Sequence, residues 1–161
     1  MSTILTVRSP AFTEGRRIPR RHTGDGEDLS PPLSWSSLPP GTKELALIVD
    51  DPDAPSAEPW VHWVLYSIPV GTEGVPEGVH PKERPPFPGG AIQGLNSWGT
   101  VGYRGPAPPR GHGVHHYHVT LHALDVVLGL PTGLDKKMLL EALAGHVLAR
   151  GELVGTYERP R

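Results

Sequence analysis

The residues with the clearest chemical potential lie in three short segments of the sequence. The first, DPDAP, places Asp51 and Asp53 directly after an apolar run, the second is WVHW with His62, and the third, GPAPPRGHGVHHY, ends in His115 and Tyr117. A carboxylate at a strand end and two imidazoles on inward strand faces can meet in one pocket when the strands are neighbours, which short connections favour. We therefore expect a small anion-receptive pocket in which Asp51 accepts a hydrogen bond from an imidazole N–H.

Each of these segments also has a structural interpretation when it is taken alone. DPDAP forms a good turn, because Pro fixes φ and Asp side chains bond nearby backbone. A single His62 in an apolar strand is more often a core histidine, and GPAPP is typical of a rigid extended connector. Only the presence of all three segments in one chain favours a binding site.

A second kind of chemistry is indicated by the histidines, because five of the nine lie between positions 112 and 122. His116 and His118 are two apart on one strand face, and His112 and His122 are near, so that with an Asp they could bind zinc or nickel. A metal-dependent hydrolase is therefore the alternative function. We expect no metal and no cofactor, because the main candidate pocket uses the opposite face of this strand. We also expect that the protein is not an enzyme, because Ser56 is not part of a GxSxG pattern that would make it a nucleophile.

The elements that must position these residues are mainly strands. Apolar or alternating runs bounded by Pro and Gly predict strands at Ile4–Val7, Leu33–Trp35, Glu44–Asp50, Trp60–Pro69, His115–Leu124 and Leu153–Tyr157. A period of two places His62 on one face with Trp60, Val64 and Tyr66.

The last predicted strands are accompanied by the one helix that the pattern supports. Alternation in the strand from 115 to 124 points His115, Tyr117, Val119 and Leu121 inward. After Pro131, the candidate caps Thr132 and Asp135 and an apolar stripe of Leu139, Leu143 and Val147 predict a helix from Asp135 to about Ala149, with Gly151 just beyond its end.

Composition supports a turn-rich β protein. The chain has 161 residues, 37% of them hydrophobic, with 20 Gly and 20 Pro, which excludes a helical bundle and fits one domain over residues 1–161. The net charge of −2 provides no field for nucleic acid. Without Cys there is neither a disulfide framework nor a thiolate zinc site. Neither a signal-peptide core nor a membrane-length apolar run is present, so we expect a cytoplasmic protein without integral membrane association.

Together, DPDAPS, WVHW and GPAPPRGHGVHHY resemble, in order and spacing, the phosphatidylethanolamine-binding protein (PEBP) family, which includes the Raf kinase inhibitor proteins. The ending GELVGTY is similar to the bacterial and archaeal branch. The resemblance implies a two-sheet antiparallel, Greek-key-like β-sandwich with one main C-terminal helix. It also implies cis peptide bonds before Pro55 and Pro59. Where the family usually has His-Arg-Tyr, this chain has His116 in the middle, so a charge that does not depend on pH is missing there.

The function that the resemblance implies is non-enzymatic binding of phosphate or phosphorylated head groups, with regulation of a kinase or protease partner left open. A homodimer is also left open. The family pocket carries over to these ligand-binding positions: Asp51, Asp53, Trp60, His62, Ala107, Pro108, His115 and Tyr117.

Overall fold

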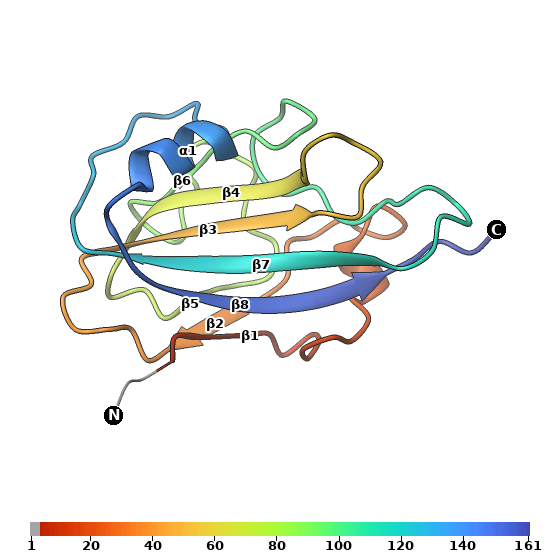
Figure 1. The fold of residues 1–161 in the computed structure, drawn as a ribbon, viewed down its shortest axis with the longest axis horizontal. Helices are drawn as coiled ribbons and strands as arrows, with labels where there is room; N and C mark the ends of the chain where they lie inside the picture. Colours follow the sequence, from red (N-terminus) through yellow and green to blue (C-terminus); the bar gives the residue numbers. More distant parts are fainter. Residues whose placement is uncertain (1–3) are drawn as a thin grey trace.

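Residues 4–161 are described by this computed structural model, and their strands form two antiparallel sheets (Figure 1). The 3-stranded sheet has the order β1-β2-β5, with β1 at Thr6–Arg8, β2 at Leu33–Ser36 and β5 at Gly74–Val75. The 5-stranded sheet has the order β6-β4-β3-β7-β8, with β6 at Ile92–Gln93, β4 at Trp60–Pro69, β3 at Glu44–Asp51, β7 at His115–Leu124 and β8 at Val147–Tyr157. The predicted mainly β sandwich with one helix is confirmed.

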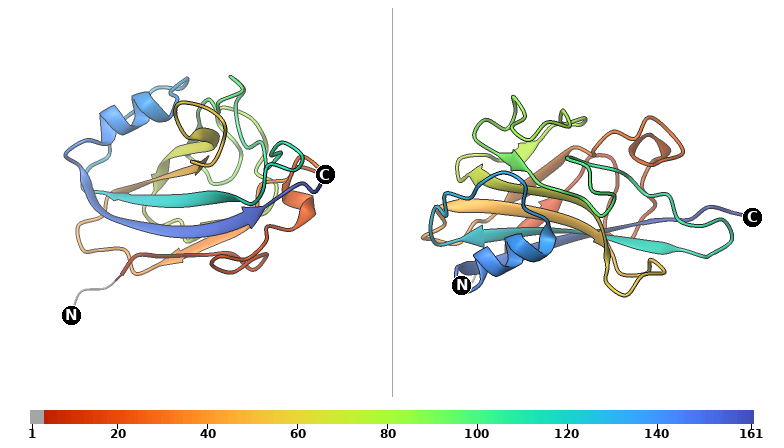
Figure 2. Two further views of the ribbon diagram at one scale, coloured as in Figure 1. Left: turned by 45° about the vertical axis from the view of Figure 1, so that its right-hand side comes forward. Right: turned by 90° about the horizontal axis from the view of Figure 1, so that it is seen from above.

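The layers follow from which faces of the larger sheet are apolar. β3 is buried on both faces: Leu45, Leu47 and Val49 pack toward the smaller sheet, whereas Ala46 and Ile48 pack on the outer face. The helix α1 (Lys136–Leu143) covers that outer face, and the smaller sheet covers the inner one (Figure 2). Because both faces are covered, β3 is a nearly continuous apolar run rather than an alternating one. No helix in the part of the chain that the structure describes has the length and apolar character needed to cross a membrane.

The alternation predicted for β7 is confirmed. Tyr117, Val119 and Leu121 belong to the inner core, and His115 on the same face is buried. On the other face, His118, Thr120 and His122 line a hollow together with Lys136 and Leu140 of α1.

In β4, by contrast, a β-bulge at His62 changes the predicted alternation. Val61 and Trp63 pair with consecutive residues of β3, so His62 is an extra residue between them. Val64 and Tyr66 pack in the outer core, whereas the His62 ring lies against an inward aromatic ring of β7. The prediction that His62 shares a face with Val64 and Tyr66 is therefore wrong, because a bulge redirects the side chain that it carries.

The predicted helix begins where expected but ends earlier. The Asp135 carboxylate accepts a hydrogen bond from the Met138 N–H at 2.9 Å, which caps the first turn. The helix ends at Leu143, and Gly145 follows with φ of 82°, a conformation that favours glycine. The prediction of a helix to Ala149 with Gly151 beyond it is wrong, because residues from Val147 onward instead pair with β7 as the first part of β8.

The segment from 14 to 18 runs along the outer edge of β8. The Gly15 N–H donates to the Val154 carbonyl, and the Ile18 N–H donates to the Thr156 carbonyl, both at 2.8 Å. A side chain on Gly155 would overlap Ile18, because a Cβ there would lie 2.6 Å from its Cγ1. This glycine therefore lets the N-terminal segment pack directly on β8.

The prediction of cis peptide bonds before Pro55 and Pro59 is wrong. Within residues 4–161, the one cis peptide bond joins Phe87 to Pro88. The loop between β3 and β4 reverses the chain over eight residues, 52–59, and is long enough to do so with trans bonds, which are the more stable form before proline by about 0.5 to 1 kcal/mol.

The outer face of β7 yields a prediction about acid stability. His122 is 4% exposed, and its burial lowers its pKa to about 4. In an unfolded chain the pKa of histidine is about 6.5, so as pH falls from there to about 4 only the unfolded state takes up this proton. Proton uptake by His122 in the unfolded state therefore lowers the free energy of unfolding by about 3 kcal/mol across that interval.

We expect His122→Gln to lose about 2 to 3 kcal/mol less stability than the unmodified protein between pH 7 and pH 4.5, as measured by urea unfolding. His146→Gln is the matched control, because His146 is more exposed and pairs with Asp125 at the surface. Equal losses in all three proteins would show that His122 does not cause acid sensitivity.

Candidate functional site

The three segments singled out by the sequence meet at one end of the larger sheet, where β3 ends and β4 and β7 begin. The register pairs Asp51 with Trp60 across β3 and β4. A pocket of about 290 Å³ opens there. Seven of the eight predicted residues line it, namely Asp51, Trp60, His62, Ala107, Pro108, His115 and Tyr117. The residues of its wall that were not predicted are Ala54, Pro55, Ser56, Trp98 and Pro109.

A chain of hydrogen bonds runs from a buried carboxylate to the surface. The His115 Nδ1–H donates to Asp51 Oδ2 at 2.6 Å, and both side chains are almost completely buried. The other carboxylate oxygen of Asp51 accepts the Asp53 N–H at 2.8 Å. On the far side of the imidazole, His115 Nε2 lies 2.6 Å from Nδ1 of His112. Asp51 thus orients His115, as the sequence predicts, and His112 is an additional partner that was not predicted in this role.

His62 is held by the peptide group that joins Arg104 to Gly105. Its Nδ1–H donates to the Arg104 carbonyl at 2.6 Å, while the N–H of the same peptide group donates to Asp28 Oδ1 at 2.8 Å. Burial lowers the pKa of His62, although the Arg104 carbonyl and the charge of Asp51 act in the opposite direction. The ring is therefore neutral at pH 7, with Nε2 as its remaining polar atom.

Asp28 adopts a left-handed conformation, with φ of 60°, that is uncommon for a residue other than glycine. Such strain is retained where the surroundings fix the residue, and here its carboxylate holds the Gly105 N–H. A Cβ on Gly105 would lie 2.1 Å from the His22 carbonyl oxygen, so only glycine fits beside this segment. No local sequence signal identified Asp28, because its contact spans 77 positions.

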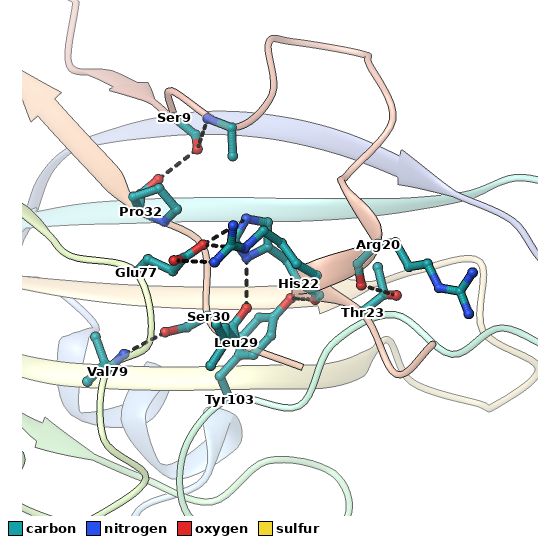
Figure 3. Close-up of polar contacts among 12 residues, drawn as sticks. Ser9, Arg20, His22, Thr23, Leu29, Ser30, Pro32, Glu77, Val79 and Tyr103 are labelled. Atoms are coloured by element: carbon teal, nitrogen blue, oxygen red, sulfur yellow. Dashed lines mark hydrogen bonds and ion pairs between the residues drawn. The ribbon is translucent and has the colours of Figure 1, made fainter. Parts of the chain in front are cut away.

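The N-terminal segment also supports this wall of the pocket through His22, whose polar contacts are drawn in Figure 3. The His22 ring lies 2.9 Å from the Leu29 carbonyl oxygen and 3.6 Å from a carboxylate oxygen of Glu77. The Tyr103 hydroxyl donates to the His22 carbonyl at 2.6 Å. These contacts position the chain just before Gly105, so the pocket depends on a segment far from it in sequence.

Tyr117 lines the pocket and carries a buried hydroxyl. Its ring packs edge-on against His62, with centroids 5.1 Å apart, and lies near His115. Among the residues that the structure describes, the hydroxyl has no hydrogen-bond partner. Burial, followed by the charge of Asp51, raises the pKa of Tyr117, so the hydroxyl keeps its proton at neutral pH and can donate.

Asp53 is the one predicted residue that does not line the pocket. Its Oδ2 accepts hydrogen bonds from the backbone N–H and from the ring Nδ1 of His116, both at 2.8 Å. Burial acts to raise the pKa of Asp53, but the two hydrogen bonds from His116 outweigh it and lower the pKa. Asp53 therefore ties the loop after β3 to the start of β7.

Two tryptophans form an aromatic wall. The Trp98 ring packs edge-on against Trp60, with centroids 5.4 Å apart, and also against His62 at 5.1 Å. The guanidinium of Arg104 lies over Trp98, 4.7 Å from the ring centroid. A large aromatic residue in a Gly- and Pro-rich stretch was the available signal for Trp98.

The histidines of the metal-hydrolase alternative have separate partners. His118 Nδ1 lies 3.2 Å from a carboxylate oxygen of Glu152, and His122 Nδ1 lies 3.4 Å from the Ala46 carbonyl oxygen. Over residues 4–161, no group of three or more His, Asp or Glu side chains is placed so that it could hold a metal ion. The side-chain geometry gives no support to this alternative.

Comparisons with known proteins agree with the architecture of the chain. The family described as "Phosphatidylethanolamine-binding protein" matches residues 8–158. A "UPF0098 protein" of Methanothermobacter thermautotrophicus is 50% identical over 155 residues, which cover 96% of this chain and 99% of that protein.

Solved structures are similar over the same extent. A crystal structure of a PEBP homologue from Chlamydia trachomatis has a TM-score of 0.87 and 40% identity, covering 98% of this chain and 99% of that one. Escherichia coli YbcL, described as a member of the mammalian PEBP family, has a TM-score of 0.90 and 31% identity, covering 97% of this chain and 99% of its own. The chain belongs to the phosphatidylethanolamine-binding protein family.

Proposed function

We propose that this protein is a non-enzymatic binding protein whose pocket takes a phosphate or a phosphorylated head group. The observation that carries the proposal is the Tyr117 hydroxyl, which is buried, protonated and without a partner among residues 4–161, and which belongs to a residue that lines the same pocket as His62 and His115. A buried donor without an acceptor is costly, and an anionic oxygen would satisfy it. The two imidazoles would supply further donors when protonated.

The negative charge of Asp51 is compatible with an anion in this pocket because it is already engaged. Its oxygens accept hydrogen bonds from His115 and from the Asp53 N–H, so the imidazole stands between the carboxylate and a ligand at Nε2. A proton on that imidazole would offset the carboxylate charge.

The size and composition of the wall favour a small ligand with an organic portion. A volume of about 290 Å³ is near the lower end of the range for small-molecule pockets. The polar groups gather around Tyr117, whereas Trp60 and Trp98 form an apolar side that suits carbon atoms attached to a phosphate. Regulation of a kinase or protease partner would, on this proposal, act through occupancy of the same pocket.

Binding without catalysis is supported by the absence of an activated nucleophile in the described part of the chain. The Ser56 hydroxyl donates to the Glu58 carbonyl at 2.6 Å. Neither His62 nor His115 has a hydrogen bond from a serine or threonine hydroxyl: their ring partners are the Arg104 carbonyl, Asp51 and His112. The pair formed by Asp51 and His115 thus orients an imidazole without a nucleophile beside it.

Removal of either imidazole should weaken binding. At pH 5, we expect His62→Ala and His115→Ala to bind inorganic phosphate and phosphoethanolamine about tenfold to a hundredfold more weakly, because a protonated imidazole donates to the anion and a hydrogen bond to a charged group contributes roughly 1.5 to 3 kcal/mol. Titration calorimetry measures the effect. His118→Ala is the control, since His118 lies on the opposite face of β7. Unchanged affinity in both variants, with circular dichroism showing folded proteins, would mean that the pocket lies elsewhere.

The Tyr117 hydroxyl should serve binding at the expense of stability. We expect Tyr117→Phe to unfold at an equal or higher urea concentration, with a gain of up to about 1 kcal/mol, because an unpaired buried hydroxyl is removed. The same variant should bind phosphate about fivefold to tenfold more weakly. Tyr103→Phe provides the contrast: it deletes the donor to the His22 carbonyl and should lower stability. Reduced stability of Tyr117→Phe together with unchanged affinity would contradict the proposal.

Anion affinity should decrease as pH rises. Protonation of His62 adds a positive charge to the pocket, and because burial lowers its pKa, its contribution should appear only below a pH of about 6.5. Sulfate is a suitable probe, since its own charge stays constant between pH 5 and pH 8. We expect tighter sulfate binding at pH 5 than at pH 8, and a smaller difference in His62→Ala. Equal affinities at both pH values would show that protonated imidazoles do not contribute to anion binding.

A further inference from the structure

His112 reaches from the surface to the one ring nitrogen of His115 that Asp51 leaves available. His112 is exposed to solvent, whereas His115 is buried, with 1% of its surface accessible. The two nitrogens lie 2.6 Å apart, and the ring planes are inclined by 56° with centroids 4.9 Å apart. This contact is a direct hydrogen bond between the rings, in which one proton is shared between two nitrogens.

The contact occupies the position through which His115 would bind a ligand. An imidazole has two nitrogens, and His115 Nδ1 is committed to Asp51. His115 Nε2 forms one strong hydrogen bond along its ring plane, and that direction is taken by His112. With Nδ1–H donated to Asp51, Nε2 can donate to a ligand oxygen only when it too carries a proton, and in that state the oxygen and His112 Nδ1 compete for the same N–H.

The attachment of His112 allows its ring to leave. The residue lies between Gly111 and Gly113, which have φ of 71° and 97°, and nothing lies within 4 Å of a Cβ placed on Gly113. The backbone of this turn is held separately, because the His112 N–H donates to the Pro109 carbonyl at 3.1 Å. Among residues 4–161, the His112 ring has no hydrogen bond other than that to His115. Rotation of the side chain alone would release His115 Nε2.

We propose that His112 is an internal competitor of the pocket: its ring holds His115 Nε2, and an anion must displace it to bind. This inference rests on the proposed function, because it concerns the same pocket. His112 is thereby a residue that sets affinity by occupying the site rather than by contacting the ligand. The opposite role, in which His112 adds a second imidazole to the bound anion, predicts an effect of opposite sign.

The test is titration calorimetry with inorganic phosphate at pH 6, because His115 Nε2 can donate to an anion only when that nitrogen carries a proton as well as Nδ1. We expect His112→Ala to bind phosphate about threefold to tenfold more tightly than the unmodified protein, because no hydrogen bond has to be broken first. His116→Ala is the matched control, since it removes a neighbouring exposed histidine whose ring partner is Asp53. That variant should not bind more tightly.

A second measurement follows the ring directly. Long-range 1H–15N spectra of the imidazoles should show the His112 resonances moving toward those of a solvated histidine as phosphate is added. Equal or weaker phosphate binding by His112→Ala would overturn the inference while leaving the proposed function in place. So would His112 resonances that do not move at saturating phosphate. Absence of phosphate binding by both proteins would overturn this inference and the proposed function together, whereas binding by His112→Ala alone would support both.

Discussion

The buried carboxylate of Asp51 is the group on which the arrangement of the pocket depends. At 3% exposure, it would be costly to bury unless both oxygens had partners. The His115 ring satisfies one oxygen and the Asp53 N–H satisfies the other. The first bond ties the end of β3 to the start of β7, and the second closes the turn that leaves β3. Displacement of either strand end would leave a charge unpaired, so the ring geometry of His115 is set by the sheet itself.

The opposite wall is fixed by a peptide group rather than by a charge pair. The carbonyl between Arg104 and Gly105 accepts from His62, and the N–H of the same unit donates to Asp28. Because both ends are held, the proline-rich segment that follows starts from a defined position. The strained backbone of Asp28 and the lack of space for a side chain at Gly105 are costs that this wall imposes. The segment that contains His22 and Asp28 thus supports the pocket although it does not line it.

Much of the fold and most of the pocket wall could be predicted from the sequence, and the misses have physical causes. β7 is regular, so its period of two placed His115 and Tyr117 on the inward face. β4 contains an extra residue at His62, and a bulge within a run of apolar residues leaves no mark on the pattern. The helix ends at Leu143 because pairing of Val147 and the residues after it with β7 outweighed an apolar stripe that continued to Val147. The roles of Asp28, Trp98 and His112 arise from contacts between loops, which no local spacing encodes.

The segment from 14 to 18, on the outer edge of β8, has a consequence for self-association. An open strand edge is a template on which a second chain can add its own strand. Here the carbonyls of Val154 and Thr156 are already taken by Gly15 and Ile18 of the same chain. Two copies therefore cannot pair their sheets along this stretch of β8 unless the hydrogen bonds of the segment from 14 to 18 are first broken. A homodimer that leaves the fold intact would have to join here by side chains packing on a surface, so its affinity would respond to changes in side-chain shape rather than to the backbone ladder.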